Sequence, residues 1–329
     1  MTILVTADLH FGDNPRDAYR FKLFKTLEQL VYDHQVDEIL ILGDLTEEKD
    51  RHSAWLVNTI VEGLYQLAKG PSITILRGNH DYVDINSPFF AFLGRVKGIR
   101  WITKPTELAC DLGGLLFLPH TNKPERDWTP WAMGQYDWIF AHHTFEGADV
   151  GHGRKLNGIN TDIFPHDNVI SGDIHVPQKL GPVEYVGAPY TVDFGDDYEG
   201  RVLILDGKKR KSIPIIMPQK KLVEASDLKD LTRVKNVYAG DILKVRYFLS
   251  ADQQQRWPEI QTAIREWSEK HGYVLHNTQP VVATNRLGGE TPKRKILVRS
   301  DQQLLESYAK QRGVDPRTLK TGLTLMGKV

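Results

Sequence analysis

The segment Gly78-Asn79-His80-Asp81 places three side chains that can do chemistry directly after a glycine. It follows Ser72–Ile75, an apolar and β-branched run that predicts a buried strand, and the glycine lets the chain turn sharply there. Amide and carboxylate oxygens are ligands for hard metal ions, and imidazole is the usual proton carrier near neutral pH. The segment therefore predicts a metal-assisted reaction whose remaining ligands lie elsewhere in the chain.

Four other predicted strand ends carry similar side chains. Each follows a short apolar run, and the residues are Asp8 with His10, Asp44, His142, and Asp173 with His175. Two neighbouring divalent ions need such a set, with one carboxylate shared between them. They bind a phosphoryl oxygen, activate a bridging water and stabilise the charge of an in-line displacement. A single histidine at a strand end is more often structural, but the ordered, joint occurrence favours a two-metal centre.

The apolar runs before these residues alternate with helical patterns near the start of the chain. Ile3–Ala7, Glu38–Leu42 and Ser72–Ile75 predict buried strands, and apolar residues recur at helical spacing in Tyr19–His34 and Trp55–Leu67. Strands that are apolar on both faces and alternate with helices are typical of a layered α/β domain. In such domains ligands bind at the carboxyl ends of the strands, where the polar residues lie.

The pattern changes after residue 98. Short predicted strands follow, interrupted by Gly147–Asp167, which we interpret as a long functional loop. We expect a domain boundary near Met217, so that residues 1–217 form one domain. Residues 218–299, with a predicted helix at Ala251–His271, form a small α+β module, and residues 300–329 hold a predicted helix, Asp301–Arg312, and a tail.

Bulk composition limits the function classes. The 329 residues favour two domains, and 42 basic against 42 acidic residues give no overall field for nucleic acid or membrane. One cysteine, Cys110, excludes an intramolecular disulfide framework and fits a reducing cytosol. No apolar run approaches the length of a membrane span. We therefore expect a cytoplasmic protein that does not associate with membranes.

The ordered motifs resemble the signature of calcineurin-like metallophosphoesterases over roughly residues 1–205. The resemblance implies a layered αββα sandwich, with a small C-terminal α+β capping module after it. It also implies two divalent ions, with Mn²⁺ expected and Mg²⁺ as the alternative. The first ion would be held by Asp8, His10, Asp44 and His175, and the second by Asp44 as the bridge together with Asn79, His142 and Asp173.

The same resemblance implies the catalytic roles. His80 would be the general acid that protonates the leaving oxygen or neutralises the phosphate. Glu47, three residues after the bridging carboxylate, would orient His80, and Asp81 would brace the loop through hydrogen bonds. One position departs from the family, which usually ends in Gly-His-x-His, because this chain has Asp173 at the first histidine. A carboxylate there favours a hard ion; the alternative is that Asp173 does not bind metal.

A finer resemblance concerns the substrate. The segments Gly187–Tyr190 and Asp193–Asp196 are similar to the segment that follows the last metal motif in DNA repair nucleases of the SbcD/Mre type, and the small size resembles phage versions. This implies a DNA exonuclease or endonuclease subunit acting on double-stranded ends. It also implies a homodimer and a coiled-coil ATPase partner of the SbcC/Rad type, with residues 302–326 either docking that partner or packing on the chain itself. The alternatives are a nucleotide phosphodiesterase, a phosphoprotein phosphatase, or a binding module with structural metals.

Overall fold

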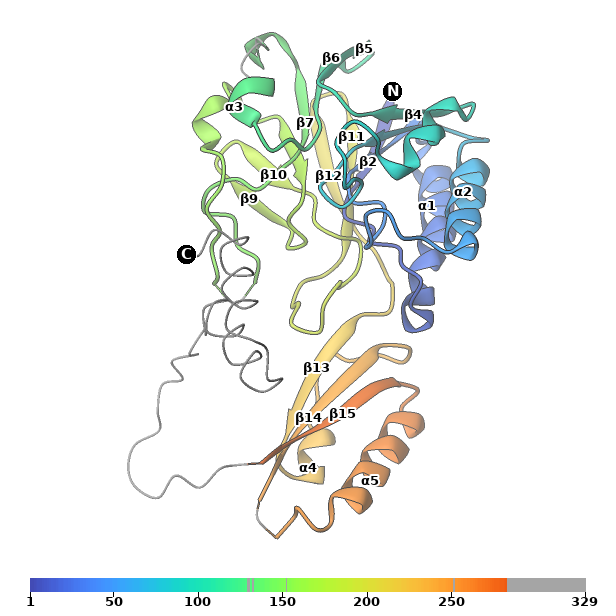
Figure 1. Ribbon diagram of the computed structural model, residues 1–329, viewed down its shortest axis with the longest axis vertical. Coiled ribbons are helices and arrows are strands. Elements are labelled where there is room, and N and C mark those ends of the chain that lie inside the picture. Colours follow the sequence, from blue (N-terminus) through green and yellow to red (C-terminus); the bar gives the residue numbers. More distant parts are fainter. Residues whose placement is uncertain (129–130, 132, 152, 251, 283–329) are drawn as a thin grey trace, which may run out of the picture. The chain divides into compact units, whose positions relative to one another are not determined.

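The first of two large sheets in the computed structural model has the strand order β12-β11-β1-β2-β3-β4 (Figure 1). The structure describes residues 1–128, 131, 133–151, 153–250 and 252–282. Four strands are parallel: β1 (Thr2–Thr6), β2 (Glu38–Leu42), β3 (Ser72–Leu76) and β4 (Ile99–Ile102). Two antiparallel strands, β11 (Arg201–Asp206) and β12 (Lys209–Pro214), complete the sheet as a hairpin.

Helices α1 (Lys22–His34) and α2 (Ala54–Leu67) pack on one face of this sheet. Their apolar stripes, such as Leu23 with Leu27 and Ile60 with Leu64, are buried against Ile39 and its neighbours. A short 3-10 helix, Pro15–Phe21, precedes α1, so the helix begins later than the expected Tyr19. The helical expectation for both segments is otherwise confirmed.

The second sheet has the order β5-β6-β7-β8-β10-β9. Its strands are β5 (Thr106–Cys110), β6 (Gly113–Leu118), β7 (Trp138–His142), β8 (Val169–Gly172), β9 (Gln178–Leu180) and β10 (Val183–Tyr185). An apolar core between the two sheets includes Leu40, Leu42, Phe117 and Phe140. The outer face of the second sheet carries loops and the short helix α3 (Pro124–Asp127). The predicted α/β sandwich class is confirmed.

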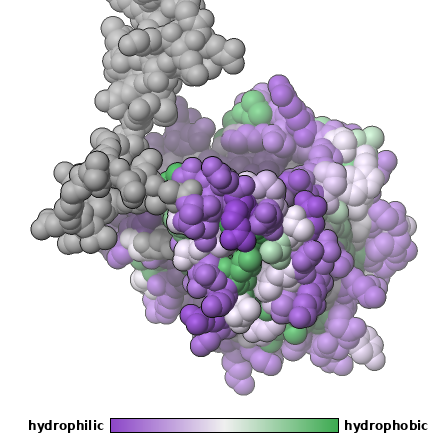
Figure 2. Space-filling view, turned by 90° about the horizontal axis from the view of Figure 1, so that it is seen from below, coloured by the Kyte–Doolittle hydropathy of each residue, from purple (hydrophilic) through white to green (hydrophobic). Residues whose placement is uncertain are grey.

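A third, smaller sheet follows. Its parallel strands are β13 (Lys220–Ala225), β14 (Ile242–Leu249) and β15 (Val274–Val282), and helices α4 (Leu228–Leu231) and α5 (Trp257–Lys270) share its core. Helix α5 begins later than the expected Ala251. From the α4–α5 end the surface is mostly hydrophilic, with a short exposed apolar strip (Figure 2).

Several expectations about the organisation of the chain remain open. Residues Met1–Ala283 form one compact unit, so the boundary expected after Met217 stays a prediction. The predicted helix Asp301–Arg312 and the tail lie outside the described residues. Within the described ranges, no helix combines the length and apolar character that crossing a membrane requires.

Candidate dinuclear metal centre

The expected metal ligands lie at the carboxyl ends of five strands. β1, β2 and β3 are parallel neighbours in the first sheet, and β7 and β8 are parallel neighbours in the second. The two edges meet where His142 Nδ1 donates a hydrogen bond to the carbonyl oxygen of Leu42, 2.6 Å away. The structure thereby brings together all seven residues, namely Asp8, His10, Asp44, Asn79, His142, Asp173 and His175.

Four of these candidate ligands have a left-handed backbone. The φ angle is 55° at Asp8, 44° at His10, 54° at Asp44 and 88° at Asp173. For a residue other than glycine this conformation costs about 1–3 kcal/mol, and such strain concentrates at functional sites. Hydrogen bonds from the Asp8 N–H to the Gly43 carbonyl (3.1 Å) and from the His10 N–H to the Asp44 carbonyl (3.0 Å) hold the first two loops in place.

The first group of ligands is centred on two imidazoles. His10 Nε2 lies 3.1 Å from His175 Nε2 and 3.7 Å from Asp44 Oδ2. On the other side of the ring, His10 Nδ1 lies 3.1 Å from the Glu47 carboxylate, an ion-pair contact whose charge favours a proton on Nδ1 over one on Nε2, although its geometry is not that of a hydrogen bond. Two imidazole nitrogens at this distance need a cation or a proton between them. The donors His10, Asp44 and His175 therefore suit a divalent ion. We call them, together with Asp8 as the family resemblance implies, the His10 group; in the structure the side chain of Asp8 converges with Asp44 and His142.

The second group is centred on the Asn79 amide oxygen. This atom lies 2.9 Å from His142 Nε2, and within 3.2 Å of the carboxylates of Asp44 and Asp173. His142 Nδ1 is already a donor to Leu42, so Nε2 presents a lone pair as well. Acceptors converging in this way repel one another unless the amide is rotated or a cation sits among them. The His142 group, meaning Asn79, His142, Asp173 and the shared Asp44, fits a hard divalent ion.

Asp8 and Asp44 are the most deeply buried carboxylates among the seven residues. Asp8 Oδ1 accepts the Asp173 N–H at 3.0 Å, whereas the buried Asp8 Oδ2 has no partner among the described residues. Burial raises the pKa of the Asp8 carboxyl to about 7, and the nearby Asp44 charge adds to this effect although His142 opposes it. Burial acts in the same direction on Asp44, but His142 and His10 hold the pKa of its carboxyl below the usual range. A cation would satisfy the unpartnered oxygen of Asp8.

The donor set therefore fits two divalent ions that share Asp44. Oδ2 of this carboxylate is directed toward His10 and Oδ1 toward His142, at 3.4 Å. Bound ions of this kind would polarise a phosphoryl oxygen and lower the pKa of a water molecule. The expected proton donor, His80, lies beside this set, its ring edge-on against that of His10 with 5.0 Å between ring centroids.

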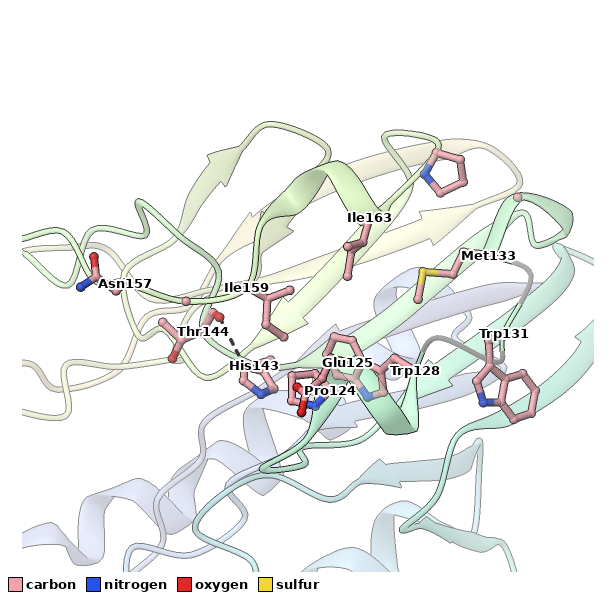
Figure 3. Close-up of a pocket in the computed structure, with 13 residues that line it drawn as sticks. Pro124, Glu125, Trp128, Trp131, Met133, His143, Thr144, Asn157, Ile159 and Ile163 are labelled. Atoms are coloured by element: carbon pink, nitrogen blue, oxygen red, sulfur yellow. Dashed lines mark hydrogen bonds between the residues drawn. The ribbon is translucent and has the colours of Figure 1, made fainter.

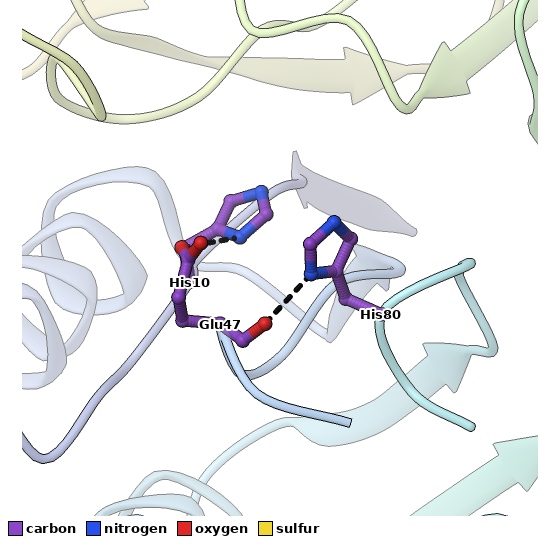
Figure 4. A group of neighbouring side chains, drawn as sticks. All are labelled: His10, Glu47 and His80. Carbon is purple, nitrogen blue, oxygen red and sulfur yellow. Dashed lines mark hydrogen bonds and ion pairs between the residues drawn. The ribbon is translucent and has the colours of Figure 1, made fainter. Parts of the chain in front are cut away.

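Glu47 and His80 are in contact, as expected, through the main chain of Glu47 (Figure 4). His80 Nδ1 donates to the main-chain carbonyl oxygen of Glu47 at 2.7 Å, whereas the carboxylate of Glu47 binds His10. The main-chain N–H of His80 donates to Asp44 Oδ1 at 2.8 Å, and this hydrogen bond fixes His80 against the expected bridging carboxylate. Protonated His80 can then present Nε2–H to a leaving oxygen. The side chain of Glu47 supports the His10 group instead, and its contact with His10 lowers the pKa of its carboxyl to about 2.

Asp81 braces the loop, as expected. Its carboxylate accepts hydrogen bonds from the N–H groups of Gly78 (2.6 Å), Asp44 (3.0 Å) and Leu45 (2.9 Å). A glycine is required at position 78, because a Cβ atom there would lie 2.2 Å from Asp44 Oδ1. The loop after β3 therefore packs directly against the segment that carries Asp44, the expected bridging carboxylate.

His143 lies on the other side of β7 from His142. Its Nε2 donates to the Thr121 carbonyl oxygen at 3.0 Å, and its ring helps to line a cavity of about 950 Å³ with Trp128, Trp131 and Ile163 (Figure 3). Trp128 is only 2% exposed and packs in the outer core of the second sheet. His143 is therefore not placed to bind either ion.

Three supporting residues belong to none of the motifs, although the sequence places His120 in a loop near the cleft. The hydroxyl of Thr144 donates a hydrogen bond to Asp173 Oδ2, which leaves Oδ1 facing the His142 group. The buried guanidinium of Arg20 donates to the His10 carbonyl oxygen at 2.5 Å and so holds the strained backbone of His10. The third is His120, whose ring centroid lies 6.2 Å from that of His142.

Comparison with known proteins gives the family. The model of the family described as calcineurin-like phosphoesterase matches residues 1–177, more than half of the chain. "Putative phosphoesterase 244L" of Invertebrate iridescent virus 6 is 27% identical over 220 residues, which cover 62% of this chain and 75% of the viral protein. Similar solved structures include Pseudomonas putida nuclease MPE, with a TM-score of 0.32, 18% identity, and coverage of 65% of this chain and 87% of that one. Another is a dimetal phosphatase from Danio rerio, with a TM-score of 0.39, 11% identity, and coverage of 66% and 99%. The chain belongs to the calcineurin-like phosphoesterase family, whose members hydrolyse phosphoester bonds with two divalent metal ions.

Proposed function

We propose that this chain is the nuclease subunit of a DNA recombination or repair complex, and that it hydrolyses phosphodiester bonds at double-stranded ends with two Mn²⁺ ions. Membership of the family gives the hydrolase chemistry. The observation that carries the finer proposal is the α+β module of β13, β14, β15 and α5, which follows the phosphoesterase sandwich. A small phosphate ester needs only the metal centre, whereas a DNA end extends beyond it and requires further protein surface.

The module is attached to the segment that follows the last metal motif. Gln219 Oε1 accepts the Thr191 N–H at 2.9 Å, and Lys220 Nζ donates to the Val192 carbonyl oxygen at 3.0 Å and pairs with Asp17 at 2.9 Å. Lys220 and Asp17 are both largely buried, so this pair is well shielded from solvent. These contacts connect the module to the loop whose sequence resembles that of the nucleases.

A cluster of exposed basic residues at the turn of the β11–β12 hairpin could bind the phosphate backbone of DNA. The β11–β12 hairpin exposes lysines at its turn, including Lys208 and Lys209. Arg210 is not free for this purpose, because it pairs with Glu184 at 3.0 Å and lies over the ring of Trp138. Balanced overall charge favours the alternative of a nucleotide phosphodiesterase or phosphoprotein phosphatase, so substrate choice is the property to measure.

The proposed complex has two further parts. We propose a homodimer, and a coiled-coil ATPase of the SbcC/Rad type as its partner. The segment expected to dock that partner, residues 302–326, lies outside the described residues. Co-purification of the chain with such an ATPase, lost on removal of residues 302–326, tests this part of the proposal.

The deciding experiment compares two substrates at equal Mn²⁺. Linear double-stranded DNA and bis(4-nitrophenyl) phosphate are each incubated with the protein, with and without the ATPase partner. Asp44→Asn serves as the inactive control. Metal-dependent degradation of DNA from its ends supports the proposal. Rapid turnover of the small ester with no DNA cleavage, even with the partner present, would favour the phosphatase or nucleotide phosphodiesterase alternative.

A further inference from the structure

His120 occupies a fixed place beside the metal centre. It lies just after β6, and its main-chain N–H donates to the Arg77 carbonyl oxygen at 3.0 Å. Nη2 of Arg77 donates back to the His120 carbonyl oxygen at 2.6 Å. Arg77 directly precedes Gly78 and Asn79, so the backbone of His120 is tied to the loop that supplies a metal ligand and the proton donor His80.

The ring of His120 is held as firmly as its backbone. It stacks on His143, with 4.9 Å between centroids and 23° between planes, and it meets His142 edge-on. Its Nδ1 lies 2.9 Å from the hydroxyl oxygen of Tyr82. Nε2 has no partner in the described part of the chain, and the side chain is only partly buried. One ring nitrogen of a side chain next to His142 therefore has no protein partner among the described residues.

The partner of Nδ1 determines what Nε2 can do. The hydroxyl of Tyr82 has one proton, and the described residues offer it no acceptor other than His120 Nδ1. Tyr82 is largely buried, its ring under the Arg77 guanidinium at 4.9 Å, and a buried donor without an acceptor is costly. The hydroxyl therefore donates to Nδ1, and neutral His120 carries its proton on Nε2.

His120 is not a further metal ligand. In the described residues, the side chains whose ligand atoms converge within 4.8 Å are Asp8 with Asp44 and His142, and His10 with Glu47 and His80. His120 joins neither set, and it lies against His142 with the two ring planes at 83°. A neutral N–H donor next to a metal-bound phosphate ester has a different use, because the phosphoryl oxygens gain charge during hydrolysis.

We propose that His120 binds the substrate, its Nε2–H donating a hydrogen bond to a non-bridging phosphoryl oxygen of the ester held at the His142 group. Tyr82 is a positioning residue that acts through His120, because its hydroxyl sets the tautomer and the ring orientation. The inference rests on the phosphoesterase chemistry of the family and applies to any phosphoester, so it does not depend on DNA being the substrate.

The first test measures binding of inorganic phosphate to the Mn²⁺-loaded protein by isothermal titration calorimetry. His120→Phe keeps a ring to stack on His143 but removes both nitrogens. We expect its affinity for phosphate to fall about 10- to 100-fold, the range for a hydrogen bond to a charged group, while both metal ions stay bound. Unchanged phosphate affinity, or loss of an ion, would overturn the proposal. This readout is independent of turnover, so it stands even where the nuclease proposal fails.

Two further variants test the contact even if His120→Phe does not fold. His120→Gln can place an amide N–H near the position of Nε2, whereas His120→Asn reaches only the position of Nδ1. We expect the glutamine variant to retain most of the phosphate affinity and kcat/KM, and the asparagine variant to lose both. Equal behaviour of the two variants would contradict a contact through Nε2.

Tyr82→Phe tests the positioning role. It removes only the hydroxyl, and we expect a smaller loss of kcat/KM than in His120→Phe and no further loss when the two changes are combined. Tyr136→Phe is the matched control, because its hydroxyl bonds Glu107 on β5, in contact with neither metal group. Additive losses in the double variant would show that Tyr82 does not act through His120.

Discussion

The two halves of the metal centre differ in what holds their ligands. In the His10 group, the ring of His10 is oriented by the carboxylate of Glu47, a side chain that is about half exposed. In the His142 group, His142 is fully buried and oriented by a main-chain carbonyl oxygen, that of Leu42 in β2. Asp44 directs one carboxylate oxygen toward each half, and Asp8 also converges with Asp44 and His142 within 4.8 Å.

This difference indicates how each half responds to mutation. A main-chain carbonyl cannot be removed by a substitution, so the orientation of His142, unlike that of His10, does not depend on a second side chain. Within the His142 group, only Asp173 is held by such a side chain, through the hydroxyl of Thr144. The His10 group also depends on side chains that touch no metal, namely Glu47 and Arg20. Side chains that contact a metal ligand, but not the metal itself, change the affinity for the metal ion by about 10- to 100-fold. Separate measurement of the two metal affinities can therefore distinguish the halves.

Asp44→Asn should have the largest effect, because it alters the one ligand shared by both halves. The amide keeps the size of the side chain but removes the charge that balances two cations. We expect both ions to bind weakly, and turnover of bis(4-nitrophenyl) phosphate to fall by more than about 10⁴-fold, the upper limit for a single proton-transferring group. Metal analysis after gel filtration gives the stoichiometry. Asp33→Asn on α1 is the control, and full retention of both ions in Asp44→Asn would refute the shared role.

His80→Ala separates proton transfer from metal binding. His80 contacts Asp44 through its main-chain N–H, which alanine retains, and its ring is adjacent to the His10 group. We expect kcat to fall about 10²- to 10⁴-fold, the usual contribution of a general acid, with both ions still bound. Departure of an ion from this variant would instead identify His80 as a ligand.

Much of this arrangement could be predicted from the sequence, because strand ends have a simple geometry. Apolar runs on both faces place β1, β2 and β3 in one buried parallel sheet, and parallel strands bring their carboxyl ends to one edge. The identities of Asp8, Asp44 and Asn79 then suffice to expect metal ligands there. The sequence also indicates that α5 begins later than Ala251, because Pro258 lies in its first turn, where proline is favoured.

Other features had no signal of this kind. The contact of His80 with Glu47 uses a main-chain carbonyl, and a main-chain contact is independent of residue type, so the sequence does not indicate which atoms of Glu47 make it. The left-handed backbone of Asp8 and Asp44 is imposed by packing around the centre, whereas residue type alone would favour other conformations. The pairing of Tyr82 with His120 joins loops that are distant in sequence, and neither residue stands in a recognisable motif.

Asp173→Ala should weaken the His142 group alone. Asp173 Oδ1 faces His142 at 3.7 Å, while its main-chain N–H, which alanine retains, binds Asp8. We expect the affinity for one ion to fall about 10- to 100-fold while the other is unchanged, measured by titration of Mn²⁺ into metal-free protein. Asp173→Asn keeps an oxygen ligand and the contact with Thr144, and should lie between the wild type and Asp173→Ala. Unchanged affinity for both ions would make Asp173 a bystander.

Glu47→Gln should have the smallest effect, and it tests the comparison most directly. Its carboxylate is ionised at neutral pH, since the contact with His10 lowers its pKa to about 2, and it steadies the Nδ1 proton of His10. Removing the charge should weaken the ion of the His10 group about tenfold, with little change in kcat once Mn²⁺ is saturating. The His80 contact survives because it uses the main-chain carbonyl of Glu47. If kcat falls at saturating Mn²⁺ while both affinities are unchanged, the side chain of Glu47 serves His80 after all, and the two halves do not differ in the way that the hydrogen bonds indicate.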